Sequence, residues 1–142
     1  MRAHAVRLTP GADLRAELER LTRELSLGAG CILACVGSLS HARLRMPAAA
    51  GEPEAFRAFE GPLEIVSLTG TLGPDGPHLH ISLAGRDGAC VGGHLVLGCV
   101  VHTTAEVVIG ELPGVTFRRV ADAATGYAEL VVTPSPDDVS KK

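Results

Sequence analysis

The chain has 142 residues, a length typical of one domain with a single hydrophobic core. Hydrophobic residues make up 46% and charged residues 20%, which excludes a disordered chain or a low-complexity polymer. The net charge of -3 argues against direct binding of DNA phosphates, and 3% aromatic residues are too few to build platforms that stack single-stranded bases.

The chain carries no sign of export or membrane insertion. Its first residues lack the apolar region of a signal peptide, and no run of about 18 apolar residues occurs, so we expect a cytoplasmic protein without a membrane span. The four cysteines lie in apolar segments without a Cys-x-x-Cys pair. We expect reduced core residues rather than metal ligands or disulfides at Cys31, Cys35, Cys90 and Cys99.

An amphipathic helix is predicted near the start of the chain. Leucines recur at positions 14, 18, 21 and 25 with charged residues between them, which places the leucines on one face. Asp13 is placed to cap the helix N-terminus, and Gly28 to end the helix in the left-handed conformation. The apolar face of this helix needs a sheet to cover.

Strands are predicted for most of the remaining chain. Residues 31–36 form the first and residues 40–44 an edge strand, followed by an irregular connection over residues 47–60. Only five of the fifty residues from 61 to 110 are charged, which marks this stretch as the interior. Turn residues divide it and the segment after it into an antiparallel meander over residues 63–72, 78–84, 89–95, 99–109 and 115–120.

These elements predict an α+β fold, a mostly antiparallel β-sheet or sandwich packed with one long amphipathic helix. The domain is expected over residues 1–132, with a flexible polar tail over residues 133–142. Odd and even positions of a strand point to opposite faces of the sheet, and residues 89–105 carry no charge at either set of positions. Both faces should therefore be covered. One helix is too small for this, and we interpret the pattern as association between subunits, with a self-contained sandwich as the alternative.

Four of the six histidines, His78, His80, His94 and His102, occur within one stretch of 25 residues inside the least charged segment. The strand period of two places His78, His80 and the hydroxyl of Ser82 on one face. A three-residue loop that pairs residue 85 with residue 89 would set His80 opposite His94, close enough to share one ion. A two-residue loop would turn His94 away. Two glycines before His94 permit a close approach of another backbone, a ligand or a bulge.

Three neutral imidazoles with an open fourth position are typical of a site for Zn²⁺ or a similar first-row divalent metal. The sequence therefore predicts metal ligands at His78, His80 and His94, with ordinary hydrogen-bonded core or interface histidines as the alternative. His102 could be a neighbour of the site or a surface residue, and His4 and His41 are expected to be uninvolved.

Glu64 and Glu106 are candidate acid–base residues because each is a single carboxylate in an apolar strand. A buried carboxylate needs a partner or has a raised pKa, so structural pairing with an arginine or an interface donor is the alternative. The chain contains none of the common hydrolase or nucleotide-binding motifs.

Several segments form a combined motif: GPLEIVSLTGTL at 61–72, HLHISL at 78–83, GGHL at 92–95 and TTAEVVI at 103–109, with Asp87-Gly88 and Gly98-Cys99 between them. Together these segments resemble the plants and prokaryotes conserved (PPC) domain in its short prokaryotic form, over residues 5–130. The resemblance implies an α+β fold, a homotrimer and a metal bound by His78, His80 and His94.

Plant members of the family join this domain to an AT-hook, an Arg-Gly-Arg-Pro segment that enters the DNA minor groove. This chain contains no such segment, so the resemblance does not imply direct DNA binding here. The favoured hypothesis is a trimeric metal-binding module that acts through a regulatory protein partner and, through it, on DNA. The alternative is a small zinc metalloenzyme or ligand-binding protein of unknown substrate.

Overall fold

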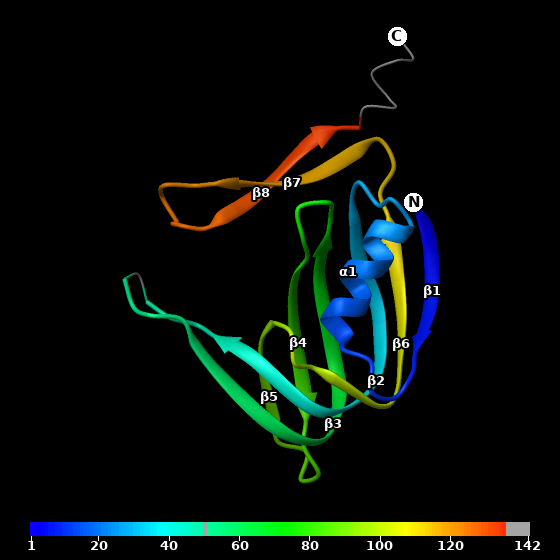
Figure 1. Cartoon of the computed structure of the whole chain (residues 1–142), viewed down its shortest axis with the longest axis vertical. Helices are drawn as coiled ribbons and strands as arrows, with labels where there is room; N and C mark the ends of the chain where they lie inside the picture. The colour runs from blue at the N-terminus through cyan, green and yellow to red at the C-terminus, as the bar shows by residue number, and fades with distance from the viewer. Residues whose placement is uncertain (50, 136–142) are drawn as a thin grey trace.

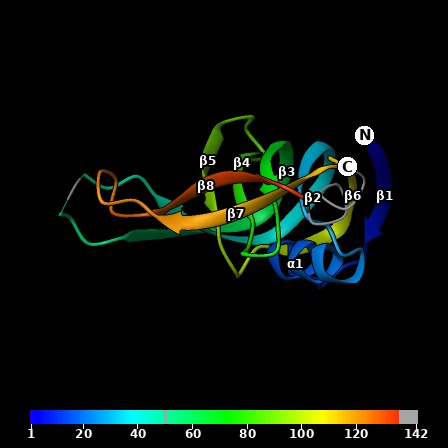
Figure 2. The ribbon, with the colours of Figure 1, turned by 90° about the horizontal axis from the view of Figure 1, so that it is seen from above.

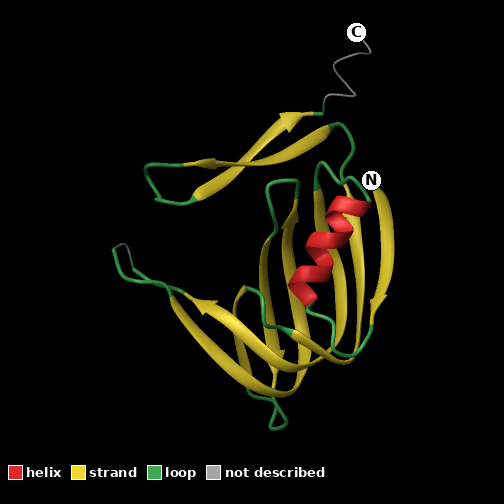
Figure 3. Ribbon diagram, viewed as in Figure 1, coloured by secondary structure: helices red, strands yellow, loops and turns green. Residues whose placement is uncertain are grey.

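Eight strands and one helix make up the described part of this computed structural model, residues 1–49 and 51–135 (Figures 1 and 3). In chain order they are β1 (Arg2–Leu8), α1 (Leu14–Glu24), β2 (Gly30–Met46), β3 (Ala55–Leu72), β4 (His78–Ala84), β5 (Cys90–Leu95), β6 (Val100–Glu111), β7 (Val115–Ala121) and β8 (Ala128–Pro134). The mostly antiparallel sheet with one helix confirms the predicted α+β class.

Six strands form one antiparallel sheet in the order β1-β6-β2-β3-β4-β5. The meander predicted from residue 63 onward is right for β3, β4 and β5 but wrong for β6, which crosses over to lie between β1 and β2. The far half of β2 also pairs with β5, so that Leu44 lies opposite Leu95 and Arg45 opposite His94. Residues 40–44 are therefore an interior strand and not the predicted edge, because β3 and β5 hydrogen-bond to its two sides.

The segment predicted as an irregular connection, residues 47–60, is confirmed as irregular over the described residues up to 54, but residues 55–60 are strand. β2 runs on to Met46 and β3 starts at Ala55, directly opposite it, so the two form one long hairpin arm that leaves the body of the sheet (Figure 1). Residues 55–58 on the β3 side of this arm are all exposed, and cross-strand pairs hold the arm, including Arg45 with Glu54 at 2.8 Å and Arg43 over the Phe56 ring. A strand end without a buried face gives no alternating hydrophobic pattern, which is why the sequence suggests a loop over residues 55–60.

The predicted helix is confirmed, and its leucine face covers one side of the sheet (Figure 2). Leu14, Leu18 and Leu21 are buried among leucines, isoleucines and valines of the strands. Asp13 caps the helix, since its Oδ1 accepts from the Ala16 N–H at 3.0 Å. The predicted end at Gly28 is wrong, because the helix stops at Glu24 and Ser26 takes the left-handed conformation with φ 51°.

A second, two-stranded sheet of β7 and β8 crosses above the turn that joins β3 to β4 (Figures 1 and 2). The Phe117 N–H donates to the Gly28 carbonyl at 2.8 Å, and the Arg119 N–H donates to the Asp75 carboxylate at 3.0 Å. Neither β1 nor β8 was predicted. β8 takes in residues 133 and 134 of the predicted tail, and residues 136–142 of that tail lie outside the described residues.

The sheet face opposite α1 is not covered by any element in the described part of the chain (Figure 2). Val36 is 59% exposed and Val66 is 58% exposed on the neighbouring strands β2 and β3.

The prediction that the cysteines are core residues holds only for Cys99, which is buried and whose thiol pKa is raised by burial to about 11. Cys31 and Cys35 are half-buried and Cys90 is exposed, and all four are free of disulfides.

Among the described residues, no helix is both long and apolar enough to cross a membrane.

Replacing Asp13 with alanine should cost more stability than the loss of an ordinary turn hydrogen bond. Its second carboxylate oxygen accepts from the Gly98 N–H at 2.7 Å, so one side chain both caps α1 and ties it to the β5–β6 connection. We expect Asp13→Ala to lower the free energy of unfolding by about 2 kcal/mol in urea denaturation. Asp122→Ala, which loses an exposed turn bond to the Ala124 N–H, is the control, and an equal loss in both would contradict the dual role.

Candidate metal centre

The strand β4 presents two histidines on one face and a row of core residues on the other. His78 and His80 are exposed, whereas Leu79, Ile81 and Leu83 between and after them are buried. This is the two-residue period expected of a strand, and it confirms that the two imidazoles share a face.

The turn between β4 and β5 brings the third histidine to the same face. The Gly85 N–H donates to the Ala89 carbonyl at 2.9 Å, which closes the predicted three-residue loop and places His80 opposite His94. The glycine before His94 is required by a close backbone approach, because a Cβ at Gly93 would lie 2.9 Å from the Arg45 carbonyl oxygen. The structure therefore has the register that the predicted site requires, with His80 paired with His94.

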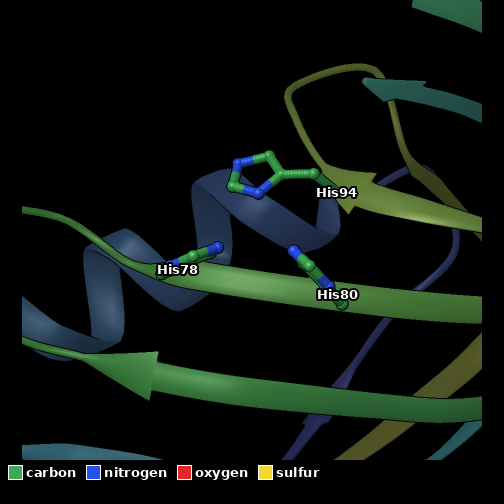
Figure 4. Close-up of side chains that lie close together, drawn as sticks. All are labelled: His78, His80 and His94. Carbon is green, nitrogen blue, oxygen red and sulfur yellow. The ribbon is translucent and has the colours of Figure 1, made fainter. Parts of the chain in front are cut away.

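The three imidazoles converge on one point (Figure 4). Ring centroids are 5.2 Å apart for His78 and His80, 5.1 Å for His78 and His94, and 5.5 Å for His80 and His94. One nitrogen from each ring lies within 4.8 Å of the other two, a spacing suited to one shared ion. The Nδ1 atom of His94 is buried and has no hydrogen-bond partner among the described residues, so the cluster fits a ligand that accepts nitrogen lone pairs.

The surroundings favour the neutral forms of His78 and His94. Partial burial lowers the pKa of His94 to about 4, and the positive charge of Arg45 acts in the same direction. Burial also lowers the pKa of His78, and the positive charge of Arg119 lowers it further. Neutral imidazole is the form that binds a metal, so near pH 7 these two rings need lose no proton to do so.

The histidines form part of a row of side chains that runs across four strands. Thr69 lies opposite His80, His80 opposite His94, and His94 opposite Arg45. Beside this row, Thr71 lies opposite His78. Arginine from β2 thus stands at one end of the imidazole cluster.

His78, His80 and His94 line a cleft of about 740 Å³, a volume within the range typical of small-molecule sites. One wall is the β2–β3 arm, with Arg45, Met46 and Glu54. The other is the β7–β8 hairpin, with Arg119 and residues 127–129. The walls approach each other where the Arg45 guanidinium lies 5.8 Å from the centre of the Tyr127 ring.

A family model described as the Plants and Prokaryotes Conserved (PCC) domain matches residues 1–113 of the chain. The chain belongs to the PPC domain family. Four-fifths of its length lies within the match, which includes all three clustered histidines and confirms the resemblance inferred from the motifs.

Relatives carry this PPC domain as part of longer chains. The chain is 45% identical over 138 residues to a bifunctional protein GlmU of Synechococcus sp., which covers 97% of the chain but 21% of that protein. It is 30% identical over 124 residues to the AT-hook motif nuclear-localized protein 20 of Arabidopsis thaliana, which covers 84% of the chain and 43% of the plant protein. The chain thus spans about a fifth of the first relative and less than half of the second.

Solved structures show the same fold. A hypothetical protein from Salmonella enterica superposes with a TM-score of 0.86 at 41% identity, with 94% of each chain covered. A metal-containing protein from Archaeoglobus fulgidus superposes with a TM-score of 0.80 at 28% identity, with 92% of this chain and 94% of that one covered.

The other predicted candidates lie outside the histidine cleft of this PPC domain. Glu64 and Glu106 are exposed and do not line it, and neither forms an ion pair among the described residues. His102 is exposed and also outside it. His4 and His41 bind glutamates instead, Glu111 at 2.8 Å and Glu60 at 3.0 Å.

Sequence reasoning missed the charged residues that do line the cleft. Asp75 comes from the β3–β4 turn, Glu54 from the β2–β3 arm, and Arg119 and Glu129 from the β7–β8 hairpin. Asp75 is only three residues before His78, but Glu54, Arg119 and Glu129 are far from the histidines in sequence and reach them only because the arm and the hairpin fold over the sheet. No periodicity within one segment could have indicated this.

The neutral histidines predict a loss of stability in acid. The pKa of His94 is about 4 in the folded protein and about 6.5 when unfolded, so the unfolded state binds the extra proton between these values. For chelator-treated protein, the free energy of unfolding should therefore be retained above pH 6.5 and fall as the pH is lowered toward 4. The His94→Gln variant should show a smaller fall in urea titrations over this range, whereas His102→Gln should match the unmodified chain. Equal falls in His94→Gln and the unmodified chain would contradict this assignment.

Proposed function

We propose that this PPC domain is a metal-dependent ligand-binding protein that acts in the cytoplasm as a homotrimer. Its centre is His78, His80 and His94, which would hold Zn²⁺ or a similar first-row divalent ion. The observation that carries the proposal is the convergence of three imidazole nitrogens within 4.8 Å, one of them buried and without a hydrogen-bond partner. Burying such an atom is unfavourable unless it is paired, and a coordinated ion would pair it.

Two further features support a metal at this position. Neutral imidazoles suit borderline first-row ions better than Mg²⁺ or Ca²⁺, which prefer oxygen. The similar structure from Archaeoglobus fulgidus is that of a metal-containing protein, at 28% identity.

The position of the cluster supports ligand binding over a purely structural role. Structural zinc sites are closed by four protein ligands, whereas the residues that the structure describes gather three candidate ligands here, and these face a cleft of about 740 Å³. When bound, such an ion supplies Lewis acidity to whatever enters the cleft. The chain's own residues would bind and orient that molecule, because both walls carry arginines and carboxylates.

Metal content tests this proposal directly. Untagged protein purified without chelator should contain about one first-row divalent ion per chain, measured by elemental analysis, and His80→Ala should lose it because only two ligands remain. His102→Ala removes an exposed histidine outside the cleft and should keep the metal. Protein that contains no metal and does not bind added Zn²⁺ would refute the proposed centre.

The uncovered sheet face supports the homotrimer. Val36 and Val66 are more than half exposed on adjacent strands, and single chains rarely leave large apolar patches in water. The sedimentation-equilibrium mass should be about three times the chain mass of 14.7 kDa. Val66→Asp should lower that mass, because it places a charge in the interface, and Ala123→Asp in the exposed β7–β8 turn should not. A monomer at all concentrations would refute the assembly.

A second candidate function is that of a module that acts through a regulatory protein partner, and through it on DNA. The relatives favour it, since the same domain forms part of a bifunctional enzyme in one and part of an AT-hook protein in another. Direct binding to DNA finds no support in a net charge of -3. Salt-sensitive binding of the isolated chain to duplex DNA would reverse that conclusion.

A further inference from the structure

Arg119 of β7 is held beside the histidine cluster by a specific contact. Its Nη2 donates to the Thr71 hydroxyl at 2.8 Å, and Thr71 is the residue directly opposite His78 on the neighbouring strand. Side chains that oppose each other across antiparallel strands have Cβ atoms about 4.5–5.5 Å apart. The guanidinium is therefore fixed one cross-strand pair away from the first imidazole, on the side opposite Arg45.

The three arginines of the cleft differ in how their charge is balanced. Arg45 is paired with Glu54 at 2.8 Å, and Arg15 with Glu19 at 2.8 Å. Arg119 forms no ion pair with any described residue, because Asp75 is paired with the neighbouring Arg118 and accepts only the backbone N–H of Arg119. A guanidinium has five N–H donors, and most of those of Arg119 stay available.

We propose that Arg119 anchors the carboxylate of a small organic acid in this cleft, next to the metal position. This inference rests on the proposed function and names the class of ligand for the same site. The planar fork of arginine matches a carboxylate with two parallel hydrogen bonds, and its fixed position by Thr71 gives the ligand one orientation. Met46 and Tyr127 on the facing walls supply apolar and aromatic surface for the carbon part of the molecule.

The charges around the cleft favour an anionic ligand. Arg15, Arg45 and Arg119 are matched in number by the carboxylates of Glu54, Asp75 and Glu129, all on the lining. A divalent ion at the three histidines would therefore leave a net charge of about +2, concentrated between the ion and Arg119. The apolar and aromatic side chains of the walls favour the carboxylate of an organic acid over inorganic phosphate, which has no carbon part to contact them.

Binding of acetate to Co²⁺-loaded protein tests the inference, because the visible absorption of Co²⁺ reports changes around the ion without any assay of activity. Acetate should shift the spectrum saturably at constant ionic strength, and inorganic phosphate should bind more weakly. Arg119→Gln should raise the acetate Kd by about tenfold or more, since it removes a charge-assisted pair of hydrogen bonds. The spectrum before acetate is added should match that of the unmodified protein.

Two further variants complete the design. Arg86→Gln is the control, because Arg86 is exposed in the β4–β5 turn and not part of the lining, and it should leave the acetate Kd unchanged. Arg119→Lys keeps the charge without the fork and should give an intermediate Kd, which preserves the test if Arg119→Gln does not fold.

The outcomes separate the two proposals. Absence of Co²⁺ binding overturns the proposed metal centre and this inference with it. Co²⁺ binding with no response to acetate, or with equal acetate affinity in Arg119→Gln, overturns only the role of Arg119. Tighter binding of phosphate than of acetate overturns the carboxylate assignment.

Discussion

The candidate site depends on one backbone constraint, the length of the loop between β4 and β5. The hydrogen bond from Gly85 to Ala89 closes a three-residue loop, and this alone decides that His80 faces His94. A slip of one residue would send His94 to the core side of the sheet and a core residue to the cleft side. The pairing of Leu44 with Leu95 fixes the same register from the other side of β5, so the sheet closure and the site support each other.

The histidine cluster is unfavourable to the fold without a ligand. A buried Nδ1 with no partner costs about 1–3 kcal/mol, and burial together with nearby arginines works against any proton that could relieve it. The surrounding core of buried leucines in α1, β4 and β5 makes this cost tolerable. A bound ion would remove the cost and add its own binding energy to the stability of the fold. Such a local penalty, kept within an otherwise satisfied core, is typical of a functional site.

The sequence predicts those features of the structure that are determined by residues within one short segment. The leucine spacing of α1, the alternation in β4 and the count of loop residues before β5 are local, and all three predictions are confirmed. The start of β3 is predicted as irregular because residues 55–58 are all exposed and no apolar period marks them. Arg119 and Glu129 were missed because a separate hairpin carries them to the cleft. Glu64 was chosen as a carboxylate in an apolar strand, yet its side chain lies on the exposed face.

The β7–β8 hairpin takes part both in the proposed ligand site and in the proposed contact between subunits. It supplies Arg119 to the cleft, and yet Val120, Val131 and Val132 on it are exposed to solvent. Its ties to the body are few, chiefly Phe117 to Gly28 and Arg119 to Asp75 and Thr71. In the proposed trimer, a neighbouring copy that covers these valines would hold the hairpin in place and so fix the guanidinium over the histidines. Because linkage is reciprocal, a ligand that binds Arg119 would in turn stabilise the assembly, and ligand affinity should then rise with protein concentration.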